Sequence, residues 1–118
     1  MSSNPVTILD AGMGKTLSQR GVEIPNSIWS ANALLVAPEV IVDIHLENIA
    51  AGARMITTNS YGVIRNDLAK VGIEDRTVEL NQLAGKLARQ ARDKAGIDGV
   101  LIAGSLPPLN GSFRPDLV

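Results

Sequence analysis

Residues 38–61 read PEVIVDIHLENIAAGARMITTNSY, and this stretch predicts a helix, a buried strand and a polar exit. Pro38 suits the first position of a helix, where its missing N–H costs nothing, and Gly52 is a natural end for that helix. Residues 55–58 form a short, mostly apolar and β-branched run, which is typical of a strand buried on both faces. The stretch therefore predicts one complete helix–strand unit of an α/β protein.

Similar short apolar runs lie on both sides of this unit, at residues 6–9 and 100–103, and we expect both to be buried strands. Shorter helical segments are expected at residues 14–19 and 30–36, with Ser30 as the N-cap of the latter. A helix near residues 63–71 should end at Gly72.

The longest predicted helix begins after Asp75, its expected N-cap, and ends at Gly96. Apolar side chains recur in it at gaps of three and four residues and so share one face. These residues are Leu80, Leu83, Ala84, Leu87, Ala88, Ala91 and Ala95.

Alternation of strands and helices predicts parallel strand pairing with right-handed crossovers. Either an open doubly wound sheet or part of a (β/α)₈ barrel satisfies this order. A three-stranded parallel sheet with two open edges is a poor independent domain. Residues 110–118 are expected to be an irregular loop without a covering helix, so we expect the chain to be truncated at its C-terminus.

Composition limits the function classes. The 118 residues carry 11 Lys+Arg and 12 Asp+Glu, and aromatic residues make up 3%, which argues against a nucleic-acid-binding surface. The chain contains no cysteine, so it offers neither a disulfide nor a thiolate, and no metal site is expected in it. We see no signal peptide and no apolar run long enough to cross a membrane, and expect a cytoplasmic protein.

Polar, glycine-rich turns follow all three predicted strands. They are residues 10–14 (DAGMG), residues 58–61 (TNSY) and residues 104–105 (GS). In parallel α/β folds the functional groups lie beyond the carboxyl ends of the strands, so these turns are expected to form a site. The alternative is that these residues only cap helices and make turns.

The segment GMGKT at residues 12–16 resembles part of a phosphate-binding loop, which leaves an NTP-binding protein as another interpretation. The full motif G-x-x-x-x-G-K-[ST] requires a glycine at position 9, where this chain has Leu9. The backbone cradle for phosphate would therefore be too short. His45 is the only histidine and is read as a surface or packing residue rather than a ligand.

Three segments together resemble the homocysteine S-methyltransferase family, which includes betaine- and S-methylmethionine-dependent enzymes. They are ILDAGMGKTLSQRGV (8–22), WSANALLVAPEVIVDIHLENIAAGARMITTNSY (29–61) and IAGSLPPLNG (102–111). The resemblance implies that residues 1–118 are a partial homocysteine-binding domain, about three βα units from the N-terminal part of a TIM (β/α)₈ barrel. It also implies a complete protein that transfers a methyl group from a sulfonium or ammonium donor to homocysteine, as in methionine biosynthesis.

In that family three cysteines hold a zinc ion that activates the thiol, and they lie on later strands of the barrel. Because this chain lacks cysteine, the resemblance implies that it contains no catalytic residue and is inactive alone. It would instead contribute substrate-binding residues. By match to the family pattern these are Asp10, Ala11, Gly12, Trp29, Ser30, Thr58, Asn59 and Tyr61.

The resemblance gives these residues separate tasks. Asp10 would attract the ammonium group of homocysteine, and backbone N–H groups at Ala11 and Gly12 would meet its carboxylate; the family usually has glycine at the Ala11 position. Trp29 would offer an aromatic face to a cationic donor. The expected partners are small molecules and either a second copy or a missing C-terminal segment. A non-enzymatic split-barrel or self-associating module remains the alternative.

Overall fold

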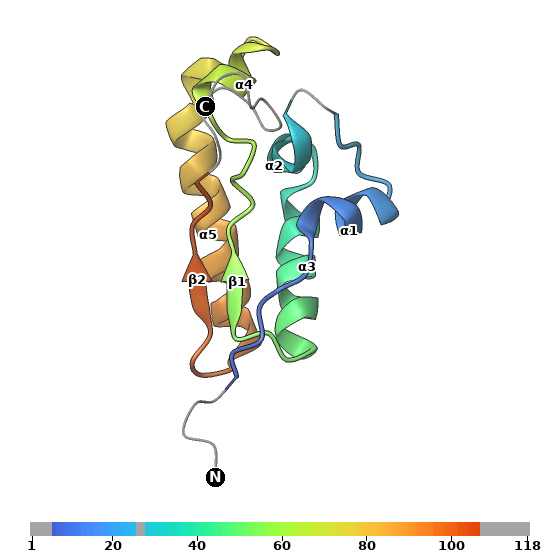
Figure 1. Cartoon of the computed structure of the whole chain (residues 1–118), viewed down its shortest axis with the longest axis vertical. Helices are drawn as coiled ribbons and strands as arrows, with labels where there is room; N and C mark the ends of the chain where they lie inside the picture. The colour runs from blue at the N-terminus through green and yellow to red at the C-terminus, as the bar shows by residue number, and fades with distance from the viewer. Residues whose placement is uncertain (1–5, 26–27, 107–118) are drawn as a thin grey trace.

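The computed structural model describes residues 6–25 and 28–106, so the predicted loop at residues 110–118 lies outside the described residues. The described elements are helix α1 (Met13–Gln19), 3₁₀ helix η1 (Trp29–Ala31), helices α2 (Asn32–Val36) and α3 (Pro38–Ala50), strand β1 (Met55–Thr57), helix α4 (Arg65–Ala69), 3₁₀ helix η2 (Glu74–Arg76), helix α5 (Thr77–Ala95) and strand β2 (Leu101–Ala103). In Figure 1 the two strands lie side by side, with α5 behind them and α3 beside β1.

The sheet confirms the predicted parallel pairing of the second and third runs. Strands β1 and β2 are parallel neighbours, with Ile56 opposite Ile102. Backbone hydrogen bonds extend the ladder by one residue at each end: Leu101 N–H donates to the Arg54 carbonyl (2.8 Å), and Thr58 N–H donates to the Ala103 carbonyl (2.9 Å). The described chain is thus a small α/β unit.

The prediction of a buried strand at residues 6–9 is wrong, and at residues 100–103 the strand is present but only Val100 is buried, with Leu101 at 56% exposure. The segment at residues 6–9 makes one parallel bridge, between Leu9 and Met55, and its side chains are exposed, with Val6 at 89% and Ile8 at 56%. It is tied to β1 by two further bonds, from Arg54 N–H to the Ile8 carbonyl (2.8 Å) and from Asp10 N–H to the Met55 carbonyl (3.1 Å). Within the described residues α3 and α5 cover one side of the sheet, and this edge segment has no neighbour on its outer side (Figure 1).

Helices α3 and α5 pack against each other and form the main core. The apolar stripe predicted for α5 is confirmed, because Leu80, Ala84, Leu87, Ala88 and Ala91 are buried. Helix α3 starts at Pro38, as predicted, and buries an isoleucine on successive turns. Helix α5 ends at Gly96, whose φ of 64° is the left-handed conformation that favours glycine at this position.

Both N-cap predictions are wrong, because a 3₁₀ turn precedes each helix. Ser30 lies inside η1, and Ala31 takes the N-cap position of α2. Asp75 lies inside η2, and Arg76 takes the N-cap position of α5. The preferences of single residues do not predict these 3₁₀ turns, because Ser and Asp are favoured in turns as well as at N-caps.

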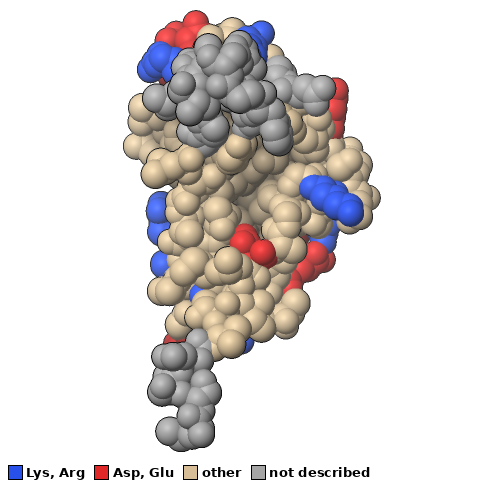
Figure 2. All heavy atoms as spheres, viewed as in Figure 1, with Lys and Arg blue, Asp and Glu red and all other residues tan. Residues whose placement is uncertain are grey.

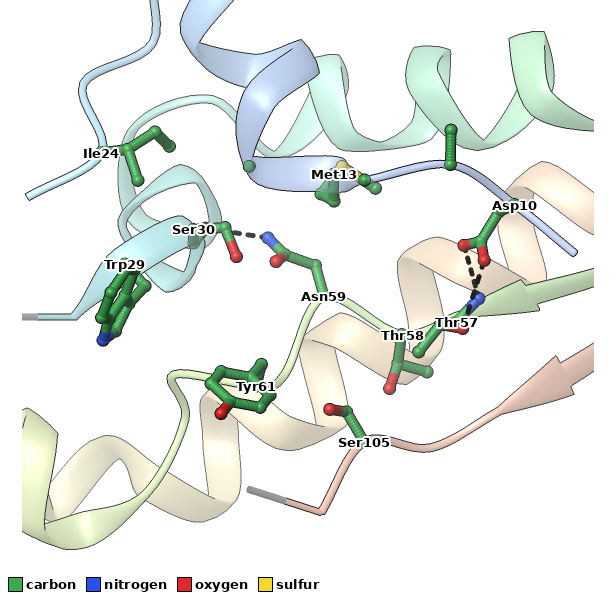
Figure 3. A pocket seen from close by; sticks show the side chains of 13 residues that line it. Asp10, Met13, Ile24, Trp29, Ser30, Thr57, Thr58, Asn59, Tyr61 and Ser105 are labelled. Carbon is green, nitrogen blue, oxygen red and sulfur yellow. Dashed lines mark hydrogen bonds between the residues drawn. The ribbon is translucent and has the colours of Figure 1, made fainter. Parts of the chain in front are cut away.

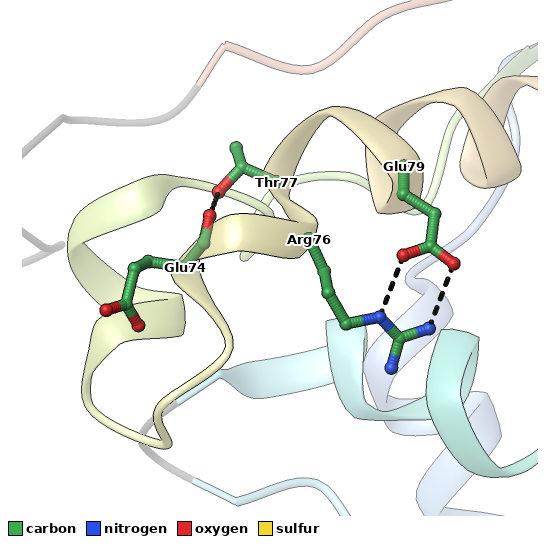
Figure 4. A network of polar contacts seen from close by, with 4 residues as sticks. All are labelled: Glu74, Arg76, Thr77 and Glu79. Carbon is green, nitrogen blue, oxygen red and sulfur yellow. Dashed lines mark hydrogen bonds and ion pairs between the residues drawn. The ribbon is translucent and has the colours of Figure 1, made fainter.

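Figure 4 shows what holds the start of α5 in place of an Asp75 cap. The Thr77 hydroxyl donates to the Glu74 carbonyl (2.6 Å), and the Arg76 guanidinium binds both carboxylate oxygens of Glu79 (2.9 and 3.2 Å). The pair raises the pKa of Arg76 and lowers that of Glu79, chiefly through the hydrogen bonds. Both side chains are exposed, so this pair contributes little to stability.

His45 lies on the buried side of α3 and is fully inaccessible to solvent. Neither of its ring nitrogens has a hydrogen-bond partner within the described residues. Burial lowers the pKa of His45, and the negative charge of Asp10 offsets part of that effect. His45 is therefore a packing residue, as one of the two interpretations had it, and its ring nitrogens are buried without hydrogen-bond partners among the described residues.

We predict a pH-dependent stability from His45. Its pKa is lower in the folded than in the unfolded chain, so the unfolded state binds the proton first as pH falls through about 6.5. The free energy of unfolding should therefore keep its full value above that pH and decrease below it. His45→Leu should flatten this dependence and raise the free energy of unfolding at pH 7 by about 1–3 kcal/mol, since an unsatisfied buried polar group is removed.

Urea unfolding of both proteins at intervals from pH 7.5 to 5.5 measures this. His45 is the only histidine in the sequence, so no other imidazole titrates in the same interval. An unchanged pH profile in His45→Leu would contradict the prediction.

No helix of the described residues is both long and apolar enough to span a membrane. The face of the molecule seen in Figure 2 is mostly uncharged, with few acidic or basic side chains over the sheet. Exposed apolar side chains on and beside the sheet include Ile8, Leu9 and Leu101.

Candidate functional site

A hollow of about 420 Å³ lies at the carboxyl ends of the strands, as the parallel topology predicts. Figure 3 shows the side chains that surround it, which come from the loop after residue 9, from η1 and from the exits of β1 and β2. The lining residues are Asp10, Ala11, Gly12, Met13, Gly14, Ile24, Trp29, Ser30, Thr57, Thr58, Asn59, Tyr61 and Ser105. All eight predicted substrate-binding residues are among them, and their roles as substrate contacts stay predictions.

Asp10 is held in place by Thr57. The Thr57 N–H donates to Asp10 Oδ2 (2.8 Å), and the Thr57 hydroxyl lies 3.3 Å from Asp10 Oδ1 (Figure 3). The carboxylate thus takes the place of a backbone carbonyl beside β1 and continues the pairing that begins at Leu9. Each carboxylate oxygen has further acceptor capacity, so the group remains able to receive a donor from a ligand.

Thr57 is not among the predicted site residues. The alternation of side chains along a strand could have indicated it, because Ile56 is fully buried on the helix side and Thr57 must therefore face the opposite side. That Thr57 meets Asp10, 47 positions away, follows from strand pairing and is not visible in the local pattern.

Asn59 and Ser60 are both buried at the exit of β1. The Asn59 side-chain amide donates to the Ser30 carbonyl (2.9 Å), which ties this exit to η1. The Ser60 and Thr58 hydroxyls share a hydrogen bond (2.8 Å). Asn59 stays a predicted substrate contact, and in the structure its amide nitrogen donates to the protein. Ser60 lies in the predicted turn at residues 58–61 but is not among the predicted substrate-binding residues.

Trp29 has an uncommon backbone conformation. Its φ is 53°, the left-handed region, which costs a residue with a side chain about 1–2 kcal/mol. Trp29 N–H donates to the Pro25 carbonyl (2.8 Å), and the side chain is half-buried beside the hollow. Strain of this kind is found where surrounding contacts fix a functional side chain.

The lining has a simple electrostatic character. Asp10 is the acidic residue among the lining residues, and no lysine or arginine is among them. Trp29 and Tyr61 add two aromatic rings, and Tyr61 is 42% exposed. A carboxylate with aromatic rings suits a positively charged ligand such as an ammonium or sulfonium group.

The residues present do not fit a zinc site. A tetrahedral zinc centre takes three or four nitrogen, sulfur or carboxylate ligands. Among residues 6–25 and 28–106 no three His, Asp or Glu side chains gather as such a group, and the sequence has no cysteine.

The GMGKT segment does not complete a phosphate-binding loop, because Leu9 stands where the motif requires a glycine. Helix α1 begins at Met13, so GMGKT lies almost wholly within its first turn. The Thr16 hydroxyl donates to the Gly12 carbonyl (3.0 Å), four residues earlier.

Parallel strands, covering helices on one side and a hollow at the strand ends are typical of α/β proteins that carry their site at the carboxyl ends of the strands. The chain belongs to the homocysteine S-methyltransferase family, whose model matches residues 7–116. It is 33% identical to a homocysteine S-methyltransferase of Escherichia coli K12 over 98% of this chain. It is also 32% identical to the homocysteine S-methyltransferase YbgG of Bacillus subtilis 168 over 80% of this chain.

The fold is similar to a solved member of the family. The metallated form of the homocysteine methyltransferase MmuM from Escherichia coli superimposes with a TM-score of 0.77 at 32% identity, over 90% of this chain and 39% of that one. This chain spans 39% and 30% of the lengths of the two sequence relatives. The predicted family is confirmed, and the similarity is to one part of those proteins.

Proposed function

We propose that the complete protein transfers a methyl group from a sulfonium or ammonium donor to the thiol of homocysteine. In that reaction the homocysteine sulfur forms a bond to the methyl carbon while the bond from the methyl carbon to the donor's sulfur or nitrogen breaks. The bonding electron pair leaves with the donor, which loses its positive charge, and the thiol proton is released. The observation that carries the proposal is the hollow at the strand ends, with Asp10 and Trp29 in its lining, in a chain of this family.

The residues of this chain bind and orient. We assign the homocysteine ammonium to Asp10, whose carboxylate is already fixed by Thr57. Backbone N–H groups at Ala11 and Gly12 face the substrate carboxylate, and Trp29 and Tyr61 offer aromatic faces to the donor. Ser30 and Thr58 also line the hollow.

The proposal places the chemistry of thiol activation outside this chain. The zinc expected for the complete family protein needs ligands that these residues do not supply. The chain alone is therefore proposed to be inactive. We further propose that residues 1–118 are the first part, about three βα units, of a (β/α)₈ barrel. A thiol substrate suits the reducing cytoplasm, where we place the protein.

Asp10→Asn tests the role of the carboxylate. The chain should bind homocysteine in calorimetric titration, and Asp10→Asn should bind it at least about tenfold more weakly, because a hydrogen bond between charged groups contributes about 1.5–3 kcal/mol. The asparagine keeps an oxygen for the Thr57 N–H, so the strand pairing is retained.

Two controls sharpen this test. Asp43→Asn removes an exposed acid on α3 and should leave homocysteine binding unchanged. A ligand without the ammonium group, 4-mercaptobutanoate, should bind the original chain and Asp10→Asn equally. Absence of homocysteine binding by the chain, or equal binding by Asp10→Asn, argues against the proposed function.

The second candidate is a self-associating or split-barrel module without catalysis of its own. It is favoured by one observation, the exposure of apolar residues such as Ile8 and Leu101 at the sheet. The same surface accommodates association with a C-terminal segment that completes the barrel.

A further inference from the structure

We infer that Asn59 and Gly62 are positioning residues that hold Trp29 in its left-handed conformation and so fix one wall of the hollow. Trp29 itself lines the hollow, and its φ of 53° marks the strained point of η1. Asn59 and Gly62 both follow β1, and they contact Ser30 of η1 and Ile28 just before it. The part of this inference that concerns the methyl donor rests on the proposed function.

Asn59 holds the residue after Trp29. Its side chain is 4% exposed, and its amide nitrogen donates to the Ser30 carbonyl at 2.9 Å. Figure 3 shows this bond running from the exit of β1 to η1. Breaking this bond is costly on the Asn59 side, because its buried amide would lose its partner.

Gly62 holds the residue before Trp29. A Cβ at Gly62 would lie 2.3 Å from the Ile28 carbonyl oxygen, 3.2 Å from the Ile28 carbonyl carbon and 3.3 Å from the Ala31 Cβ. The φ of Gly62 lies outside the left-handed region. The glycine is therefore required by the closeness of the Ile28 backbone and not by its own conformation.

The two contacts enclose Trp29 between fixed neighbours. Gly62 allows the Ile28 backbone to approach, and Asn59 binds the Ser30 carbonyl, so the intervening residue cannot relax to a more favourable φ without breaking one of them. The backbone that carries the indole is thus fixed before any ligand arrives. A preformed aromatic wall avoids the ordering cost of binding, which favours a compact cationic donor that fits the existing space.

Tryptophan fluorescence measures the environment of Trp29 directly, because Trp29 is the only tryptophan of the chain. In Gly62→Ala the new methyl group must displace the Ile28 backbone, and in Asn59→Asp the donor to the Ser30 carbonyl is lost at unchanged side-chain size. Both variants should show a red-shifted Trp29 emission and stronger acrylamide quenching, with far-UV circular dichroism retained. Both should also lose the emission change that S-methylmethionine causes in the original chain.

Matched substitutions elsewhere provide the controls. Gly85→Ala in α5 meets only the end of the Arg89 side chain, and Asn48→Asp in α3 makes the same amide-to-acid change at a side chain that donates no hydrogen bond among the described residues. Both should keep the original emission and quenching.

The outcomes separate the two claims. Original emission and quenching in folded Gly62→Ala and Asn59→Asp overturn the positioning role. If Gly62→Ala unfolds, Asn59→Asp decides alone. If S-methylmethionine leaves the emission of the original chain unchanged, the proposed function fails, whereas the emission and quenching of the variants still decide whether Asn59 and Gly62 position Trp29.

Discussion

Leu80→Ala is expected to lower the free energy of unfolding by about 2–5 kcal/mol and to leave the chain largely unfolded at 25 °C. Leu80 is fully buried on α5, within the cluster that joins α3, α5 and α1. The sheet contributes two strands of three residues each, so most of the cohesion comes from this helical core. The free energy of unfolding of such a small unit is low, so a loss of this size is enough to unfold most of the chain.

Urea unfolding followed by far-UV circular dichroism measures this loss. Val78→Ala is the matched control, because Val78 lies two residues away on the same helix and is 64% exposed. Its effect should stay within about 0.5 kcal/mol. Similar losses in the two variants would show that the α3–α5 core is not the source of stability.

Self-association of the chain is the second expected result, and Leu101→Lys is expected to suppress it. Leu101 is 56% exposed on β2, at the edge of the sheet, and Ile8 and Leu9 are exposed beside β1 on its other edge. Unpaired backbone groups at such edges, together with exposed apolar side chains, favour pairing with another chain. A lysine on an edge strand opposes that pairing because its charge would be buried.

Sedimentation velocity at micromolar concentration tests this expectation. The chain should sediment mainly as oligomers, and Leu101→Lys should shift it toward the 12.4 kDa monomer. Val78→Lys places the same charge on an exposed apolar site of α5, away from the sheet, and should leave the distribution unchanged. A monomeric original chain would contradict the proposed self-association, and a cooperative unfolding transition of that monomer would also contradict the fragment interpretation.

The helices were predictable because their signals are local. Pro38 and the glycine at position 52 bracket α3, and the three- and four-residue spacing of apolar residues in α5 survives intact in the core. The starts of α2 and α5 were not predictable from Ser30 and Asp75, because the competition between a capping turn and a 3₁₀ helix is decided by the preceding residues and their packing.

The strands were predictable in position but not in burial. Whether residues 6–9 are covered depends on neighbours far along the chain, which an apolar pattern cannot supply. The site shows the same division. Its location follows from parallel topology, whereas Thr57, Ser60 and Gly62 owe their places to contacts with Asp10, Thr58 and Ile28 that form only in the folded chain.

The bond between Thr57 and Asp10 has a consequence for how substitutions at this position are interpreted. The same carboxylate ends the pairing of the first segment with β1 and supplies the negative charge of the hollow. Ligand recognition and strand pairing therefore share one functional group, and a substitution that removes both side-chain oxygens would alter both. A ligand that binds Asp10 would also stabilise the pairing of residues 8–10 with β1. Ligand binding should therefore increase the order of this segment at the edge of the sheet.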